Sequence, residues 1–266
     1  MSVFRRIPGR QSSKLVGMTE HSTHTAGVAL VTGGSRGIGA ATARRLASDG
    51  FDVAITYVSG EDKAREVVSA VEAAGRRALA VRADSGEPGA IEAAVARTAN
   101  VLGRLDVLVN NAGEFLVAPL ENITLDDFDR TMAVNVRAPF AAAKAALEHM
   151  RDGGRIINIG SNIAERAIFP GFSLYSASKA ALVGLAKGLG RELGPRGITV
   201  NVVHPGPTDT DTNPADGPNA ETINSFTALG RYASPDEIAA AVSFLASDGG
   251  RYVTGTAISV DGGFSA

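Results

Sequence analysis

The chain of 266 residues carries 26 Lys and Arg against 28 Asp and Glu, a balance that argues against a nucleic-acid or anionic-membrane binding surface. The absence of Cys excludes a disulfide framework, a thiol nucleophile and a Cys-based metal site, and it is typical of a cytoplasmic protein. Hydrophobic residues make up 44% of the sequence, but no run of about 18 apolar residues would span a membrane. The four His residues show no ligand pattern, so no metal site is expected.

The first 26 residues show no strand or helix pattern and are predicted to be a disordered tail. The tail is basic but lacks the apolar stretch that a secretory signal requires. Met18 is an alternative start of translation, and a basic transit peptide is the other alternative. Residues 27–266 are predicted to form a single domain, because no linker-like segment interrupts them.

The stretch 28–50, VALVTGGSRGIGAATARRLASDG, is typical of a buried strand, a glycine-rich turn and an amphipathic helix. The glycines Gly33, Gly34, Gly37 and Gly39 permit positive φ angles and a close approach of a ligand to the backbone. The N–H groups at the start of a helix attract anions such as a pyrophosphate. The turn therefore predicts a dinucleotide site, although its spacing differs from G-x-G-x-x-G and glycines also mark ordinary tight turns.

The alternation of short apolar runs with amphipathic stretches continues to the C-terminus. It predicts a Rossmann-type, doubly wound α/β fold, with a sheet of seven parallel strands and helices on both faces. The ligand site of such a sheet lies at the C-terminal ends of its strands. The predicted strands are 28–31, 52–57, 78–83, 106–110, 155–159, 199–203 and 257–260, and the later predicted helices are 61–74, 88–103, 124–150, 174–193 and 235–246.

The segment 206–224, GPTDTDTNPADGPNAETIN, is rich in Pro, Gly, Asp, Thr and Asn and leaves the predicted ligand edge of the sheet. A long polar loop at this position is either a lid over the ligand or a disordered segment. We favour the lid, because binding loops concentrate at this edge.

Four polar features fall at the same predicted edge: the segment 110–113, Asn135, Ser161, and the pair Tyr175 and Lys179. Tyr175 and Lys179 are about one helical turn apart and share a face. A nearby ammonium favours the phenolate and lowers the pKa of a tyrosine from its usual value of about 10. Ser161 can donate a hydrogen bond to a carbonyl oxygen on which negative charge develops. Together these groups can polarise and protonate a ketone.

Each of these residues also has a purely structural interpretation. A tyrosine at a helix start commonly packs in the core, a lysine one turn later is commonly solvated, and Ser161 can cap a turn. Their combination with the glycine-rich turn, on one side of the predicted sheet, favours the catalytic interpretation. His204 needs no functional partner to be explained.

Five motifs in order resemble the single-domain short-chain dehydrogenase/reductases: TGGSRGIG at 32–39, NNAG at 110–113, YSASK at 175–179, NVVHPGPTDT at 201–210 and VDGG at 260–263. The resemblance extends from residue 27 to the C-terminus. Within the family, the chain resembles the 3-oxoacyl-(acyl carrier protein) reductase-like carbonyl reductases. The resemblance implies that residues 27–266 form a dinucleotide-binding catalytic domain of an NAD(P)-dependent oxidoreductase acting on CH–OH and C=O groups.

The resemblance also implies a role for each polar residue. Tyr175 is the catalytic acid/base, and Lys179 binds the nicotinamide ribose and lowers the pKa of Tyr175. Ser161 stabilises the carbonyl oxygen, and Asn135 holds a water in the proton relay. The expected cofactor contacts are Gly33, Ser35, Arg36, Gly37, Ile38, Gly39, Tyr57, Asp84, Asn111, Ala112, Gly113, Tyr175, Lys179, Pro205, Gly206, Thr208 and Thr210.

Two features bear on this resemblance. Ser161 and Tyr175 lie one residue farther apart than is commonest in the family, but a loop insertion should leave the chemistry intact. Pro139 lies in the predicted helix that carries Asn135 and cannot donate to the main-chain carbonyl of Asn135. We therefore expect a kinked helix whose free Asn135 carbonyl faces the site, as a water-holding role requires.

The cofactor choice depends on the end of the second predicted strand. NAD enzymes of this architecture place an acid there, about 20 residues after the glycine-rich turn, to bind the ribose 2′-OH. Tyr57 occupies the region and no Asp or Glu follows before Glu61. Arg36 can instead bind a 2′-phosphate through charge-assisted hydrogen bonds. The sequence therefore predicts NADPH (NADP+) as the cofactor.

The leading hypothesis is an NADPH-dependent carbonyl reductase with Tyr175 as proton donor and a small-molecule or acyl-carrier-bound substrate. The alternative is a nucleotide-binding regulator, because PGPTDTDTNPADGP at 205–218 also resembles a bacterial oxidoreductase-like protein linked to cyclic-di-GMP binding and biofilm dispersal. A catalytically silent scaffold is disfavoured, because it has no use for a tuned phenol.

The helix predicted at 174–193 has more small residues than one core face needs, at Ala177, Ala180, Ala181, Gly184 and Gly188. A second face of small residues would let another helix approach closely, whereas the alternative is tight packing within the subunit. The family resemblance implies a homotetramer, with the last strand and the VDGG turn at a second interface.

Overall fold

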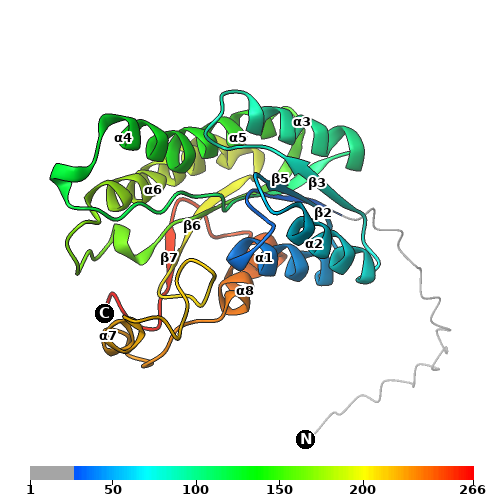
Figure 1. Cartoon of the computed structure of the whole chain (residues 1–266). Helices are drawn as coiled ribbons and strands as arrows, with labels where there is room; N and C mark the ends of the chain where they lie inside the picture. Colours follow the sequence, from blue (N-terminus) through cyan, green and yellow to red (C-terminus); the bar gives the residue numbers. More distant parts are fainter. Residues whose placement is uncertain (1–26) are drawn as a thin grey trace, which may run out of the picture.

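The computed structural model describes residues 27–266, so the tail predicted for residues 1–26 lies outside the described range (Figure 1). Seven parallel strands form one sheet in the order β3-β2-β1-β4-β5-β6-β7, which confirms the predicted doubly wound architecture. The strands are β1 Val28–Val31, β2 Asp52–Tyr57, β3 Ala78–Arg82, β4 Leu105–Asn110, β5 Met150–Ile159, β6 Thr199–Pro205 and β7 Ala257–Val260.

Helices cover both faces of the sheet, with α3, α4, α5 and α6 on one face and α1, α2 and α8 on the other (Figure 1). The short helix α7 lies apart from both layers, near the C-terminus. The helices are α1 Gly37–Ser48, α2 Glu61–Ala73, α3 Ala90–Leu102, α4 Leu125–Met132, α5 Ala138–Ala146, α6 Ser173–Leu193, α7 Ala220–Ser225 and α8 Pro235–Ala246.

Strand β1 lies in the middle of the sheet and is buried on both faces. Val28 and Leu30 pack in the core beneath α3, α5 and α6, whereas Ala29 and Val31 pack in the core beneath α1, α2 and α8. All four side chains are completely buried. Each buried Val or Leu contributes about 1.5–3 kcal/mol to folding, so the two cores hold the glycine-rich turn that follows β1 in a fixed position.

The helix predicted over 124–150 is wrong in its extent and its continuity. The structure contains α4, then a π-helical turn η2 at Ala133–Arg137, then α5, and the chain has already entered β5 at Met150. The N–H of Ala138 donates to the carbonyl of Ala133, five residues back. Pro139 is the next residue and has no N–H group to donate to a carbonyl of the preceding turn. The wider π-helical turn accommodates this missing donor, at the place where the sequence predicted a kink.

The segment after β6 folds back on itself rather than running as an open loop. Thr208 pairs with Ala233 and Thr210 pairs with Asn213 through isolated bridges, and α7 forms at the end of the segment. This local structure fits the predicted lid better than the disordered alternative. Phe226 directly follows α7, and its ring contacts the ring of Phe169.

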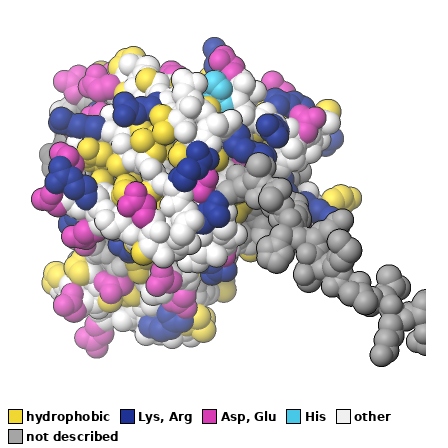
Figure 2. Space-filling view, turned by 90° about the vertical axis from the view of Figure 1, so that its right-hand side faces the viewer, with side chains coloured by type: hydrophobic (Ala, Val, Ile, Leu, Met, Phe, Trp, Pro, Cys, Tyr) yellow, Lys and Arg dark blue, Asp and Glu magenta, His cyan; other side chains and the backbone are white. Residues whose placement is uncertain are grey.

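The side of the molecule nearest the β3 edge carries charges of both signs. Figure 2 shows Lys and Arg side chains interspersed with Asp and Glu side chains over this face, with hydrophobic side chains between them. Such a mixed surface does not form the single-sign field that attracts a polyanion. No helix within residues 27–266 is long and apolar enough to cross a membrane.

Candidate active site

The glycine-rich turn after β1 is bonded to the loop that follows β4. The hydroxyl of Thr32 accepts hydrogen bonds from the N–H groups of Asn111 and Ala112, each at 3.0 Å. The side-chain amide of Asn111 donates to the carbonyls of Thr32 and Gly33. Asn111 and Ala112 therefore lie at the predicted cofactor edge, and the Asn111 side chain fastens the two loops together.

Two glycines of the turn leave no room for a side chain. A Cβ on Gly39 would lie 2.4 Å from the Gly33 carbonyl oxygen, and a Cβ on Gly33, whose φ is +61°, would lie 3.0 Å from Ala112 Cα. Gly37 has a φ of +52° and lies against Thr210 of the lid. The turn is thus compact, and it brings the lid next to the start of α1.

The start of α1 has the properties of an anion site. Its N-cap residue, Arg36, has an extended backbone and gives the helix no side-chain cap, and the first turn holds no acidic residue. The N–H groups of Gly37, Ile38 and Gly39 therefore face a position where a helix dipole favours negative charge. This uncapped start, together with the close turn, fits the pyrophosphate of a dinucleotide.

Three charged side chains gather beside this turn. Lys63 of α2 forms an ion pair with Asp211 of the lid at 2.6 Å. The Lys63 bond, with a smaller contribution from Arg36, lowers the pKa of Asp211. Sequence reasoning predicted Arg36 here but missed Lys63 and Asp211, which lie far apart in the chain. Tyr57, also predicted to contact the cofactor, ends β2 and is half-buried.

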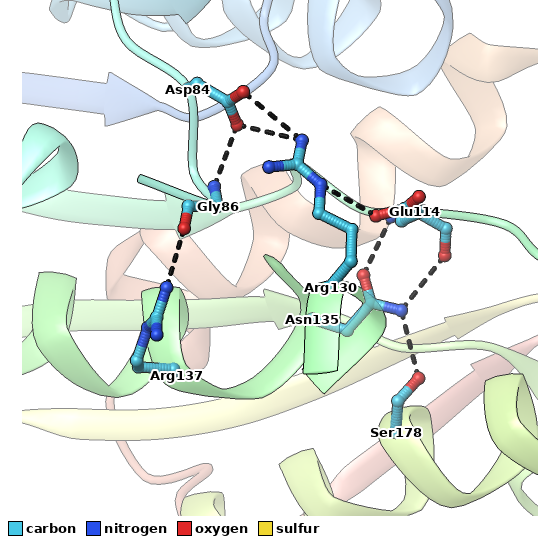
Figure 3. A network of polar contacts seen from close by, with 7 residues as sticks. All are labelled: Asp84, Gly86, Glu114, Arg130, Asn135, Arg137 and Ser178. Atoms are coloured by element: carbon cyan, nitrogen blue, oxygen red, sulfur yellow. Dashed lines mark hydrogen bonds and ion pairs between the residues drawn. The ribbon is translucent and has the colours of Figure 1, made fainter. Parts of the chain in front are cut away.

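Asp84, predicted to line the cofactor, is held by the protein itself (Figure 3). Its carboxylate accepts from the Gly86 N–H at 2.8 Å and from Arg130 at 3.0 and 3.2 Å. The Gly86 bond, followed by Arg130, lowers the pKa of Asp84. Arg130 also pairs with Glu114 at 3.2 Å, and so connects the end of β3 to the loop after β4.

Asn135 lies in the π-helical turn and is buried. Its side-chain oxygen accepts from the Glu114 N–H at 2.8 Å, and its side-chain nitrogen donates to the Glu114 carbonyl and the Ser178 hydroxyl at 3.0 and 2.9 Å (Figure 3). The hydrogen bonds of the Asn135 side-chain amide thus join the loop after β4 to α6. A water held by Asn135 would have to use its main-chain carbonyl, as the sequence analysis expected.

Ser161, Tyr175 and Lys179 meet at the C-terminal edge of the sheet. Ser161 lies two residues after β5, where its hydroxyl accepts the Ile163 N–H at 3.2 Å, and this hydroxyl is near enough to the Tyr175 phenol, in the first turn of α6, to lower the pKa of that phenol. The Lys179 Nζ atom lies 5.8 Å from the Tyr175 ring centroid and donates to the Ile159 carbonyl at 2.9 Å. The structure therefore brings together the three residues that the sequence placed at one edge.

The pKa values of this group differ from the expectation. Burial raises the pKa of Tyr175, and the bond to Ser161 counteracts the rise only in part. Burial also lowers the pKa of Lys179 to about 8. The predicted lowering of the Tyr175 pKa by Lys179 is therefore wrong for the chain alone, because burial raises this pKa and only Ser161 counteracts the rise. The phenol is consequently protonated at pH 7, and Lys179 is still mostly charged.

His204, to which the sequence gave no role, lies directly behind Ser161. Its Nδ1 atom accepts the Ser161 N–H at 2.9 Å, so the ring proton is on Nε2, which is buried, without a hydrogen-bond partner among the described residues, and 4.0 Å from Glu165. Burial is the main cause of its lowered pKa, which keeps the ring neutral at pH 7. A lone His in a strand gives no sequence signal for such a contact.

The residues after β6 form the remaining wall of the site. Gly206 approaches the strand β7 end so closely that a Cβ would lie 2.5 Å from Asp261 Cα. The Thr208 hydroxyl donates to the Gly206 carbonyl at 3.0 Å, and Thr210 lies against Gly37. Pro205 ends β6, next to β5, and Thr210 reaches the glycine-rich turn, so this segment runs along the predicted cofactor edge.

A family model described as "Enoyl-(Acyl carrier protein) reductase" matches residues 33–265. The chain belongs to the short-chain dehydrogenase/reductase family and is an NAD(P)-dependent oxidoreductase. It is 42% identical over 237 residues to the Escherichia coli K12 "Cyclic-di-GMP-binding biofilm dispersal mediator protein", covering 89% of this chain and 96% of that one. It is 41% identical over 242 residues to a Synechocystis "3-oxoacyl-[acyl-carrier-protein] reductase", covering 90% and 97%.

A solved structure of similar fold contains a nucleotide. A short chain dehydrogenase from Burkholderia cenocepacia J2315, described as in complex with NADP, is 55% identical, with a TM-score of 0.88 and coverage of 90% of this chain and 97% of that chain. The likeness confirms the family and the fold predicted from the five motifs.

Proposed function

We propose that the protein is an NADPH-dependent carbonyl reductase of the 3-oxoacyl type. The observation that carries this proposal is the gathering of three side chains at one edge of the sheet: the buried Lys179 ammonium lies 5.8 Å from the centroid of the Tyr175 ring, and Ser161 acts on the pKa of that phenol. The names of the relatives from Synechocystis and Burkholderia cenocepacia support it. We further propose that residues 27–266 act as one catalytic domain and that the protein functions in the cytoplasm.

In this proposal the start of α1 and the loop after β4 hold the nucleotide, and the nucleotide supplies a hydride when bound. The Ser161 hydroxyl donates a hydrogen bond to the substrate carbonyl oxygen as negative charge develops on it. The Tyr175 hydroxyl, protonated at neutral pH, transfers its proton to that oxygen and completes the alcohol. The charge of Lys179 stabilises the phenolate that remains. The main-chain carbonyl of Asn135 holds the water that returns a proton.

A second candidate function is binding of cyclic-di-GMP, favoured by the name of the Escherichia coli relative. The lid argues against it, because residues 206–226 contain four acidic residues and no Lys or Arg. The segment that resembles the relative therefore offers no cation of its own to the two phosphates of cyclic-di-GMP. NADPH consumption with a ketone panel, beside calorimetry with cyclic-di-GMP, decides between the two. Turnover supports the reductase, whereas tight cyclic-di-GMP binding without turnover of any ketone would reject it.

The proposed preference for NADPH rests on Arg36 of the glycine-rich turn and Lys63 of α2, and on the absence of an acid between the end of β2 and Glu61. Replacing Arg36 with Ala removes a charge-assisted contact with the 2′-phosphate, so the ratio of kcat/KM for NADPH over NADH should fall about tenfold. Arg65→Ala is the matched control, because Arg65 lies on α2 but pairs with Glu61 and Asp62. Equal or better kcat/KM of the wild type with NADH would contradict the preference.

We propose a homotetramer built in part through α6. The small residues predicted to form a second face are not used within the subunit, since Gly184 and Gly188 are exposed and have open space around them. A hollow of 540 Å³ lies beside this face, between Phe140 and Leu185. Phe140 is 52% exposed, which favours burial against a second copy. The last strand and the VDGG turn would form the other interface.

Light scattering at micromolar concentration should give four times the subunit mass of 27.3 kDa. Gly184→Glu places a charge in the proposed helix contact and should reduce the mass to that of a dimer or monomer. Val101→Glu, at an exposed position of α3, should leave it unchanged. A monomer mass for the wild type would reject the tetramer.

A further inference from the structure

Phenylalanine side chains gather around the proposed proton donor. The chain contains ten Phe and four Tyr, and aromatic residues make up only 5% of the sequence. Phe115 meets the Tyr175 ring edge to face at 4.9 Å, and Phe172 meets it at 6.5 Å. The series continues from Phe172 to Phe169 at 6.5 Å and from Phe169 to Phe226 at 5.6 Å. We call Phe115, Phe169, Phe172 and Phe226 the aromatic wall.

The wall is assembled from three segments that the fold holds together. Phe115 lies in the loop after β4, Phe169 and Phe172 lie just before α6, and Phe226 follows α7 of the lid. The first two segments are joined by a backbone hydrogen bond from Ala118 to the Gly171 carbonyl at 3.2 Å. Phe226 is supported from below by the buried ring of Phe264 at 6.0 Å. The rings are therefore positioned before any ligand arrives.

The wall keeps apolar surface open next to the reacting group. Phe115 is 54% exposed, and Phe169, Phe172 and Phe226 are half-buried. Rings that served only to pack the core would be covered, as Phe264 is with an exposed fraction of 2%. A ring entering this site could meet the wall in the edge-to-face geometry that aromatic pairs prefer.

The segments that supply the wall hold more acidic than basic side chains. The lid residues Asp209, Asp216 and Glu221 are acidic, Asp211 is paired with Lys63, and residues 206–226 hold no Lys or Arg. Arg166, the cation in the loop between β5 and α6, donates to the carbonyls of Phe264 and Ala266. A carrier protein of net negative charge would therefore meet like charges at this entrance. A neutral small molecule would not.

We propose that the aromatic wall binds the aryl ring of a neutral small-molecule ketone whose carbonyl oxygen lies at Ser161 and Tyr175. The inference rests on the proposed carbonyl reductase function and names its substrate class. It favours a free ketone that carries an aryl ring over an acyl-carrier-bound substrate.

The test compares 4-phenyl-2-butanone with 4-cyclohexyl-2-butanone, because two methylene groups isolate each carbonyl from its ring. The cyclohexyl ring is the more hydrophobic, so a surface that binds through the hydrophobic effect alone would prefer the cyclohexyl ketone. The wall should prefer the phenyl ketone by about fivefold in kcat/KM. Phe115→Leu should reduce this ratio to about one, and Phe115→Tyr should preserve it. Phe128→Leu, an exposed Phe of α4 outside the wall, is the control and should preserve it as well.

Two results would reject the proposed role of the aromatic wall while leaving the reductase proposal intact. One is equal or faster reduction of the cyclohexyl ketone by the wild type, and the other is an unchanged ratio of kcat/KM for the phenyl over the cyclohexyl ketone in Phe115→Leu. Calorimetry of 4-phenyl-2-butanol and its cyclohexyl analogue with protein and NADPH tests the wall without turnover, because an alcohol and the reduced nucleotide cannot react with each other. If no ketone is reduced but the phenyl alcohol binds more tightly in a Phe115-dependent manner, the wall stands and the proposed reductase activity fails. If neither alcohol shows a Phe115-dependent difference, the wall is rejected.

Discussion

Tyr175→Phe should lower kcat for ketone reduction by about 100-fold or more while leaving the affinity for NADPH nearly unchanged. The substitution removes only the hydroxyl, and a positioned general acid contributes about 10²–10⁴-fold to the rate. Because burial raises the pKa of Tyr175, the wild-type phenol remains protonated through neutral pH. Wild-type reduction should therefore not decline through deprotonation of Tyr175 between pH 6 and pH 8.

The matched control is Tyr252→Phe, because Tyr252 is 99% exposed and loses the same atom. It should retain the wild-type kcat. Retention of kcat within about threefold in Tyr175→Phe would remove Tyr175 from the role of proton donor. A large loss of NADPH affinity with kcat intact would assign Tyr175 to nucleotide binding instead.

Lys179→Met should abolish most activity and yet stabilise the fold at neutral pH. The Lys179 side chain is only 4% exposed, and burial lowers its pKa from 10.5 to about 8. A folded-state pKa below the unfolded value means that the charged form is disfavoured on folding, at a cost of about 3 kcal/mol below pH 8. Losing the hydrogen bond to the Ile159 carbonyl costs about 1–2 kcal/mol, so the net gain is about 1–2 kcal/mol.

The stability gained in Lys179→Met should depend on pH. The cost of burying the ammonium is fully present below about pH 8 and disappears as the pH rises toward 10.5, because the lysine is then neutral in both states. Denaturant unfolding of wild type and Lys179→Met should therefore show the variant more stable at pH 7 and the difference shrinking by pH 10. Lys187→Met, an exposed lysine on α6, should show no such trend. A variant less stable than wild type at pH 7 would contradict the account.

The sheet and the catalytic group could be predicted because their signals are local. The apolar run at Val28–Val31 and the glycines after it determine a strand and a turn, and Tyr175 and Lys179 share a helix face by spacing alone. Parallel βα units then bring the strand ends to one edge. The same logic failed for the helix at 124–150, because a π-helical turn depends on packing that periodicity does not report.

The remaining site features depend on contacts between distant segments. Arg130 joins Asp84 to Glu114, and His204 accepts the Ser161 N–H, but none of these pairs has a sequence spacing that marks it. Polar residues of this kind are individually common on surfaces and strands. Only the fold, which brings the ends of β3 and β4 to one edge of the sheet and places β6 beside β5, brings them within hydrogen-bond distance.

The central claim is that this chain reduces a ketone with a hydride from NADPH. The most direct measurement uses NADPH deuterated at the transferred position, a ketone such as 4-phenyl-2-butanone, and mass spectrometry of the product. The account predicts an alcohol with one deuterium on the carbinol carbon, formed by the wild type and about 100-fold more slowly by Tyr175→Phe. An alcohol without deuterium, or no alcohol from any ketone of a broad panel, would contradict it.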